Sequence, residues 1–338
     1  MRSSQTSKTQ RKRDYERRKR RLKDILSSLD GVSGGYITDK QLQEFGIRVT
    51  ELDFYSGKTA GSKPAFFMPA APHVYTVANS GIDPENDAFA QGCRSKRRKV
   101  HGDRGWPEDL LLAYQAYDRA LAEKYAGSTW QASARRYILA DPVKRGRWYP
   151  IGGESQRFQT EWSEEIWPEK NSHRQLEMTT DDYGLDCRPF VSELIVLVSW
   201  MLGGMRGQPS KTLSKKGASA KRESKFHMIF PVLVISFLKP ARARVVQGYF
   251  DEGTLNIQIS KCYDFNVPNY IDVMNSLLRW GRPIPQGNTT LEKTLPAVSE
   301  EAEDEEEEEY SAEGTNSADR NTLLGPGAEG SSSSAGTC

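Results

Sequence analysis

The chain is poor in the residues that build metal sites and disulfide frameworks. Its 338 residues include four cysteines and four histidines. The cysteines have no C-x-x-C spacing, and the histidines form no H-x-x-x-H pair. Ligands this few and this scattered favour neither a disulfide-stapled fold nor a zinc ribbon. We therefore predict no metal ion and no cofactor.

Long hydrophobic runs are also rare. Apolar residues make up 37% of the chain, which is low for a globular domain, so part of the chain should lie outside any core. The most apolar helical candidate, residues 189–205, is interrupted by Glu193 and Ser199 and is shorter than a bilayer span. The N-terminus lacks the apolar stretch of a secretory signal. These absences predict an intracellular protein with no membrane partner.

Charge is abundant, and the two ends of the chain carry opposite signs. The net charge is +2, yet residues 1–23 hold eleven Lys and Arg against two acids, whereas residues 300–309 hold nine acids and no base. Such asymmetry is typical of interaction tails. We expect disordered, charged termini, with an acidic tail over residues 286–338. That tail either contacts basic partners or only improves solubility.

A helix is predicted near the N-terminus, over residues 11–31. Leu22, Ile25, Leu26 and Leu29 repeat at helical spacing and form an apolar stripe, and five consecutive bases precede it. The helix should therefore be basic in its first half and amphipathic in its second. The candidate nucleic-acid contacts are Arg11, Lys12, Arg13, Arg17, Arg18, Lys19, Arg20 and Arg21.

Residues 16–20, with the sequence ERRKR, resemble the E-R-x-R-R core of basic helix-loop-helix proteins. The resemblance implies a helix in the major groove of DNA, in contact with bases and phosphates. It ends after residue 30, because residues 36–50 hold too little helix before Gly46 to form the second, dimerising helix of that family. The sequence leaves two interpretations equally open: sequence-independent contact with nucleic acid or an acidic partner, and a solvated or nuclear-import segment. Sequence-specific DNA binding is less favoured than either.

A second basic run lies in a polar, turn-rich stretch that we expect to be an exposed loop. Four consecutive bases followed by a small apolar residue are typical of a nuclear-import signal. The pattern predicts a nuclear localisation and an import receptor as a partner, and an ordinary charged loop is the alternative. The four bases are Lys96, Arg97, Arg98 and Lys99.

The remaining patterns predict an α+β fold, in which helices pack on a three-stranded antiparallel meander. Helices are expected at about residues 107–140, with a break at Gly127, and at 189–205 and 270–280. Three apolar or alternating runs between residues 228 and 260 predict the strands. In the third strand the apolar residues should face a core and the intervening polar residues should face water.

Four segments are predicted along the chain. Residues 1–30 form the basic helix, and residues 31–105 are irregular, with weak strand candidates at 46–52 and 73–77. Residues 106–285 form the α+β domain, which includes irregular chain from 141 to 188 and a basic mobile loop at 206–225. Residues 286–338 are the disordered tail.

Three blocks within residues 188–282 carry a second resemblance. They read FVSELIVLVSWMLGGMRG, HMIFPVLVISFL and ARVVQGYFDEGTLNIQISKCYDF. They resemble an uncharacterised family of filamentous-fungal proteins. The resemblance implies a folded domain and a fungal source, and it brings no activity and no site residue.

These observations favour a non-enzymatic nuclear interaction protein that contacts nucleic acid or chromatin through its basic N-terminal helix. The alternative is a protein–protein scaffold with an unknown partner, in which the charged segments adjust solubility and import. A more remote alternative is a metal-dependent nuclease that uses Glu193, Asp251 and Glu252. The Asp-Glu-Gly sequence is better explained as a hairpin turn.

Overall fold

The computed structural model describes most of the first 290 residues. The described residues are 8–59, 65–87, 90, 106–125, 130–132, 149–151, 154–156, 158–166, 172–184, 188–206 and 226–290. All of them belong to one compact unit of residues 1–293. This unit spans the segment ends predicted at residues 30 and 105. The predicted import run at residues 96–99, the basic loop predicted at 206–225 except its first residue, and the tail predicted at 286–338 except its first five residues lie outside the described residues.

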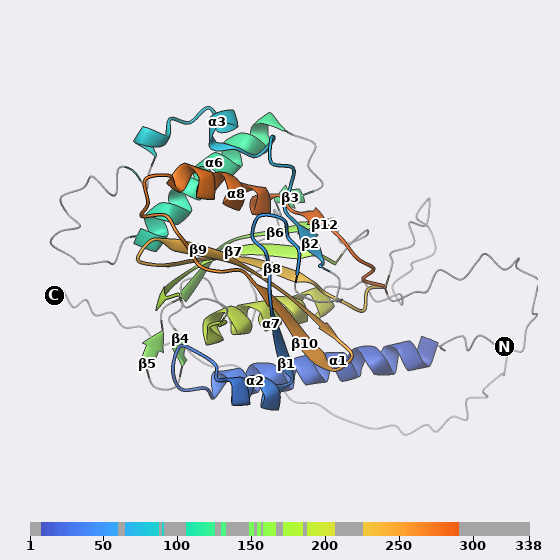
Figure 1. Ribbon diagram of the computed structural model, residues 1–338. Helices are drawn as coiled ribbons and strands as arrows, with labels where there is room; N and C mark the ends of the chain where they lie inside the picture. The colour runs from blue at the N-terminus through green and yellow to red at the C-terminus, as the bar shows by residue number, and fades with distance from the viewer. Residues whose placement is uncertain are drawn as a thin grey trace, which may run out of the picture. The chain divides into compact units, whose positions relative to one another are not determined.

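A mixed sheet of eight strands forms the centre of this unit (Figure 1). The strand order is β1-β10-β9-β8-β7-β6-β3, and β11 pairs with β9. The pairs β1–β10 and β7–β8 are parallel, and the other pairs are antiparallel. The strands are β1 Ile47–Glu51, β3 Trp130–Ala132, β6 Phe158–Ile166, β7 Arg174–Tyr183, β8 Val232–Lys239, β9 Arg242–Asp251, β10 Thr254–Ile259 and β11 Tyr263–Asp264.

Helices cover both faces of the sheet, which confirms the α+β class. Helices α6 (Trp106–Lys124) and α8 (Tyr270–Gly281) lie on one face, whereas α7 (Val191–Arg206) lies on the other and α1 (Lys8–Asp30) packs against α7 (Figure 1). All four helices were predicted, α1, α6 and α8 from apolar periodicity and α7 from a segment that is apolar on most faces. None of the helices that the structure describes is both long enough and apolar enough to cross a membrane.

The smaller elements connect and cap these layers. Thr76 caps the short helix α3 by accepting a hydrogen bond from the Asn79 N–H, so the strand predicted at residues 73–77 is wrong. The remaining elements are α2 Asp39–Phe45, β2 Phe67–Met68, α3 Val77–Ser80, the 3₁₀ turn Pro84–Asn86, β4 Tyr149–Ile151, β5 Glu154–Gln156 and β12 Ile284–Pro285. Strand β2 pairs with β12, and β4 pairs with β5.

The predicted meander is present, but it is only the middle of the sheet. Strands β8, β9 and β10 pair consecutively and antiparallel. The prediction of a three-stranded antiparallel sheet is wrong, because β7 joins β8 and β1 joins β10 in parallel. Strands β6 and β7 were missed because their sequences, FQTEWSEEI and RQLEMTTDDY, are too polar to resemble buried strands.

The helix predicted over residues 129–140 is contradicted at its start. Residues 130–132 form β3, which pairs with β6 at the edge of the sheet. Residues 133–140 lie outside the described residues. A tertiary pairing with distant chain therefore decides the conformation of residues 130–132, as often happens for short segments of mixed propensity.

The hydrophobic residues form two cores, one on each face of the sheet. Along β8, Val232 and Val234 belong to the core shared with α7 and α1, whereas Leu233 and Ile235 belong to the core shared with α6 and α8. A strand that is covered on both faces has no polar side, which explains the unbroken apolar run of β8.

The polar side of β10 does not face water. Asn256, Gln258 and Ser260 are all buried, so the predicted alternation of buried and wet faces is wrong for this strand. Chain around residues 65–70 covers this side: the Phe67 N–H donates to Gln247 on the neighbouring strand β9 at 3.2 Å. This cover is irregular and distant in sequence, so no periodic pattern could indicate it.

Candidate nucleic-acid interface

Helix α1 is anchored in the fold through its apolar side. Tyr15, Leu22, Ile25 and Leu29 are buried in the core that also contains α7. The Tyr15 hydroxyl donates a hydrogen bond to the carbonyl of Met205, near the end of α7. The helix is therefore an integral part of the domain and presents only one side outward.

Three of the eight predicted contact residues also bond inside the fold. Arg18 pairs with Asp251 at 2.9 Å and donates to the carbonyl of Phe250 at 3.1 Å, and its side chain is only 15% exposed. Arg21 donates to the carbonyl of Phe45 at 3.0 Å. The third, Arg11, donates to the carbonyl of residue 290 at 3.4 Å. These arginines tie α1 to the β9–β10 hairpin, to α2 and to the C-terminal end of the described chain.

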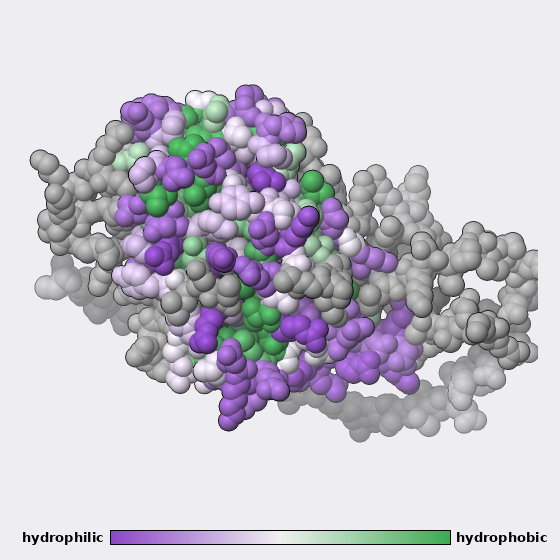
Figure 2. Space-filling view, viewed as in Figure 1, coloured by the Kyte–Doolittle hydropathy of each residue, from purple (hydrophilic) through white to green (hydrophobic). Residues whose placement is uncertain are grey.

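The other five predicted residues lie toward solvent, together with one base that the prediction left out. We call this set the basic face: Lys12, Arg13, Arg17, Lys19, Arg20 and Lys23. All are exposed except Lys19, which is half-buried. In Figure 2 hydrophilic side chains gather along the part of the surface where α1 lies. Lys23 follows from the same helical periodicity, because it falls one full turn after residues 19 and 20.

The basic face is only partly neutralised. Arg17 pairs with Asp14 at 2.6 Å, and its side chain stays 78% exposed. Within the part of the chain that the structure describes, the other five bases have no carboxylate at ion-pair distance. Two further acids, Glu16 and Asp24, are exposed nearby. Six bases against three acids leave an excess of three positive charges, which attracts polyanions and is screened by salt.

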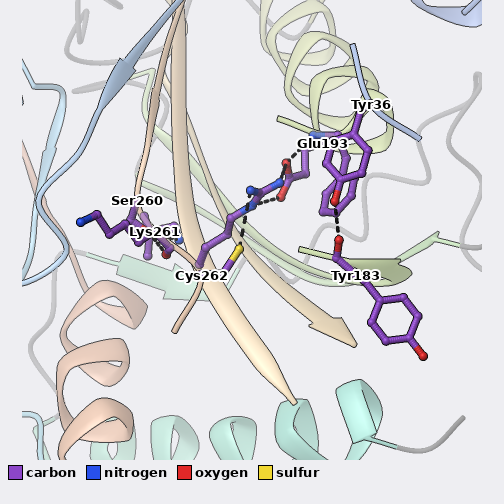
Figure 3. Close-up of polar contacts among 9 residues, drawn as sticks. Tyr36, Tyr183, Glu193, Ser260, Lys261 and Cys262 are labelled. Atoms are coloured by element: carbon purple, nitrogen blue, oxygen red, sulfur yellow. Dashed lines mark hydrogen bonds and ion pairs between the residues drawn. The ribbon is translucent and has the colours of Figure 1, made fainter. Parts of the chain in front are cut away.

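The residues of the nuclease alternative are not brought together. The carboxylate of Glu193 accepts hydrogen bonds from the Arg244 Nε at 2.8 Å and from the Phe190 N–H at 2.9 Å (Figure 3). Both members of this ion pair are fully buried. Burial is the largest single influence and would lower the pKa of Arg244, but the charge of Glu193 and its hydrogen bond, together with smaller effects of Cys262 and Tyr36, raise the pKa above its usual value. Glu193 therefore fastens α7 to β9.

Asp251 lies at the opposite end of β9 from Arg244. The two residues are seven positions apart, which corresponds to about 23 Å of strand. Glu252 and Gly253 both have positive φ and form the two-residue turn between β9 and β10, as the hairpin explanation predicted. The described residues contain no group of three or more His, Cys, Asp or Glu that could hold a metal ion. The geometry gives no support to a metal-dependent nuclease site at these three residues.

A small cavity lies beneath α1. It is lined by Arg18 and Leu22 of α1 and by Met201 and Met205 of α7, among others, and its volume is about 10 Å³. This is room for about one water molecule. Small-molecule sites are typically about 300 Å³ or larger, so this cavity is a packing defect rather than a ligand pocket.

Comparisons with models of protein families, with curated proteins and with solved structures found no match for this chain. The fungal resemblance and the helix-loop-helix resemblance therefore stay predictions. Any function has to be argued from the placement of the residues themselves.

Proposed function

We propose that this is a non-enzymatic nuclear protein that binds nucleic acid, free or in chromatin, through the basic face of α1. The observation that carries the proposal is that the bases of α1 have two different placements. The helix bonds Arg18 and Arg21 into the fold and leaves the six bases of the basic face toward solvent, with the exposed acids Glu16 and Asp24 among them.

The arrangement of the basic face is costly if its only role is solubility. Arg13 and Arg17 are four residues apart, and so are Lys19 and Lys23, so like charges lie on adjacent turns. Such pairs destabilise a helix by a few tenths of a kcal/mol each. A surface that only kept the protein soluble would be better served by interspersed signs. A polyanionic partner would remove this repulsion.

The net charge of the compact unit, residues 1–293, also favours a polyanionic partner. Residues 294–338 hold twelve acids against one base, a net charge of −11, so the +2 of the chain leaves +13 for residues 1–293. A strongly basic unit concentrates polyanions around it and speeds their association.

The nuclear part of the proposal rests on the basic run at residues 96–99. A fluorescent protein fused to residues 90–105 should accumulate in the nucleus through an import receptor. A cytoplasmic signal from this fusion would show that residues 90–105 do not act as a nuclear-import signal.

The binding part is tested with the full chain and a variant in which the six bases of the basic face are replaced by Gln. The matched control also replaces six exposed bases by Gln, all outside α1: Lys40, Arg48, Lys58, Arg119, Arg188 and Lys261. Anisotropy of a labelled 30-base-pair DNA in 100 mM salt should show at least a tenfold loss of affinity for the variant and little change for the control. Equal affinities would favour the scaffold alternative.

A further inference from the structure

The described chain ends beside helix α1. Arg11 donates a hydrogen bond to the carbonyl of Thr290 at 3.4 Å, on the side of the unit where α1 begins (Figure 1). The preceding residue, Thr289, is buried, and its carbonyl accepts bonds from the N–H groups of Met228 and Ile229 at 2.8 and 3.0 Å. The chain is therefore anchored next to the N-terminal half of α1.

The most acidic segment of the sequence follows this anchor within reach of the helix. Nine residues separate Thr290 from the run at 300–309, which holds nine acids and no base. Ten residue steps span at most about 35 Å, whereas α1 advances by about 18 Å from Arg11 to Lys23, the last base of the basic face. The start of the acidic run can therefore reach any part of that face.

The bases of the basic face lie on two sides of α1. An α-helix turns by about 100° per residue, so three lysines fall within about 40° of one another around the axis. We call Lys12, Lys19 and Lys23 the lysine row. Three arginines fall within about 60° of one another on the neighbouring side. We call Arg13, Arg17 and Arg20 the arginine row.

Acidic side chains offset the arginine row more than the lysine row. Asp14 pairs with Arg17 at 2.6 Å. The exposed Asp24 lies between Arg13 and Arg17 around the axis. Three arginines against two acids leave this side with a net charge of +1, whereas the three lysines keep +3. Glu16 lies between the two rows, so the lysine row is the more positive edge of α1.

We propose, on the basis of the nucleic-acid role above, that the acidic run at residues 300–309 binds the basic face of the same molecule and competes there with nucleic acid. The run lies along the lysine row, where the positive charge is least offset. A series of carboxylates offers the same dense negative charge as a phosphate backbone. The free protein thus keeps its contact surface occupied by its own tail.

The tether makes a weak contact sufficient. A group on a short linker acts at an effective concentration of about 1 mM. A dissociation constant of about 0.1 mM for the free segment then gives about ten occupied molecules for each open one, and the affinity for DNA falls about tenfold. At micromolar protein, a second copy would supply its tail at a concentration about a thousandfold lower. The same molecule is therefore the favoured source of the acidic run.

The contact itself is tested with a labelled peptide of residues 296–312. The full chain used here has the nine acids of the run replaced by Gln or Asn, so that its own tail does not compete. Anisotropy in 50 mM salt should give a dissociation constant of about 0.1 mM, a value that the tether makes sufficient. A peptide with the same nine replacements should not bind.

Three matched variants of this chain locate the contact. K12Q/K19Q/K23Q should weaken peptide binding about tenfold, because exposed ion pairs contribute about twofold each. R13Q/R17Q/R20Q should weaken it by only about twofold. K40Q/K58Q/K261Q, which also removes three exposed bases, should have little effect. Circular dichroism melts of all three variants, recorded alongside, establish that they are folded.

The competition is tested with a 20-base-pair DNA duplex. Replacing the nine acids in the full chain should raise its affinity for the duplex about tenfold in 50 mM salt, and an excess of the peptide should reverse the gain. The gain should shrink as the salt rises to about 200 mM, because exposed charges are screened. The control E313Q/D319N/E329Q neutralises the other three acids after residue 293 and should raise the affinity no more than about twofold.

The outcomes separate this contact from the nucleic-acid role. Unchanged DNA affinity after replacement of the nine acids, or peptide binding that ignores the lysine row, would overturn the contact. The nucleic-acid role would then stand as long as DNA still binds through the basic face. Peptide binding along the lysine row of a chain that binds no DNA would support the contact and contradict the nucleic-acid role.

Discussion

At the scale of single residues, arginines of one helix have opposite roles. Arg18 lies on the same side of α1 as Leu22 and Ile25, and it bonds to the β9–β10 hairpin. Arg20, two positions later, is exposed. The sequence shows both as members of one basic run. Only the helical phase relative to the apolar stripe separates them, because positions 18, 22, 25 and 29 repeat at intervals of three and four.

We predict that Arg18→Ala destabilises the protein by about 1–3 kcal/mol, because it leaves the partly buried Asp251 and the carbonyl of Phe250 without a donor. The exposed Arg20→Ala should change stability by no more than about 0.5 kcal/mol. Urea unfolding of both variants measures the difference. Equal losses would show that the contacts of Arg18 do not hold α1 in place.

His173 is a second residue whose role follows from its surroundings. It is buried beside Phe66 and Phe67, and its Nε2 lies 2.8 Å from the carbonyl of Gln286. Burial lowers the pKa of His173 from 6.5 to about 4. The folded protein therefore holds this imidazole neutral, whereas the unfolded chain takes up a proton below pH 6.5.

Since the folded pKa is lowered, the contribution of His173 to stability is complete above pH 6.5 and is lost as the pH falls to about 4. The loss amounts to about 3 kcal/mol over this range. Urea unfolding at pH 7 and pH 4.5 should show the decline, and His173→Phe should reduce it. An unchanged pH dependence in His173→Phe would contradict the buried neutral state.

At the scale of elements, α1 is both a core helix and the candidate binding surface. Ile25 and Leu29 are among its buried residues, 1% and 0% exposed, so α1 closes one of the two cores over α7. Deleting residues 1–30 would therefore remove the contact surface and part of the core together. Surface substitutions are the cleaner way to test binding.

We predict that a chain lacking residues 1–30 melts without cooperativity or aggregates, because it exposes the apolar side of α7. Ile25→Ala alone should cost about 2–5 kcal/mol through the cavity it leaves. Leu112→Ala on α6 is the control, because Leu112 is 53% exposed and should cost little. A cooperative melt of the truncated chain at the temperature of the full chain would contradict this account.

At the scale of the whole molecule, sequence patterns gave the helices more reliably than the sheet. Apolar periodicity located α1, α6 and α8, an all-round apolar segment located α7, and the apolar run of β8 located the central strand. Strand β7 escaped because polar residues such as Gln175 and Glu177 are buried in it through bonds to Gly281 and Gln115. Those partners belong to distant helices, so no local pattern could show that the strand lies inside.

The candidate site was also predictable only in part, because some of its contacts are made with distant segments of the chain. Composition identified the basic run, and helical phase could have removed Arg11 and Arg18 and added Lys23. The bonds of Arg11 and Arg21 could not be foreseen, because their acceptors are backbone carbonyls in remote segments. The pairing of Glu193 with Arg244 likewise depends on how α7 lies over β9.

The central claim is that the basic face of α1 binds nucleic acid through phosphates. The most direct measurement is the affinity of the full chain for duplex DNA between 50 and 200 mM salt. Contact by five or six bases predicts a slope of log K against log salt of about −5, and the variant that lacks all six should approach zero slope. A slope that is equally steep in that variant would contradict the claim.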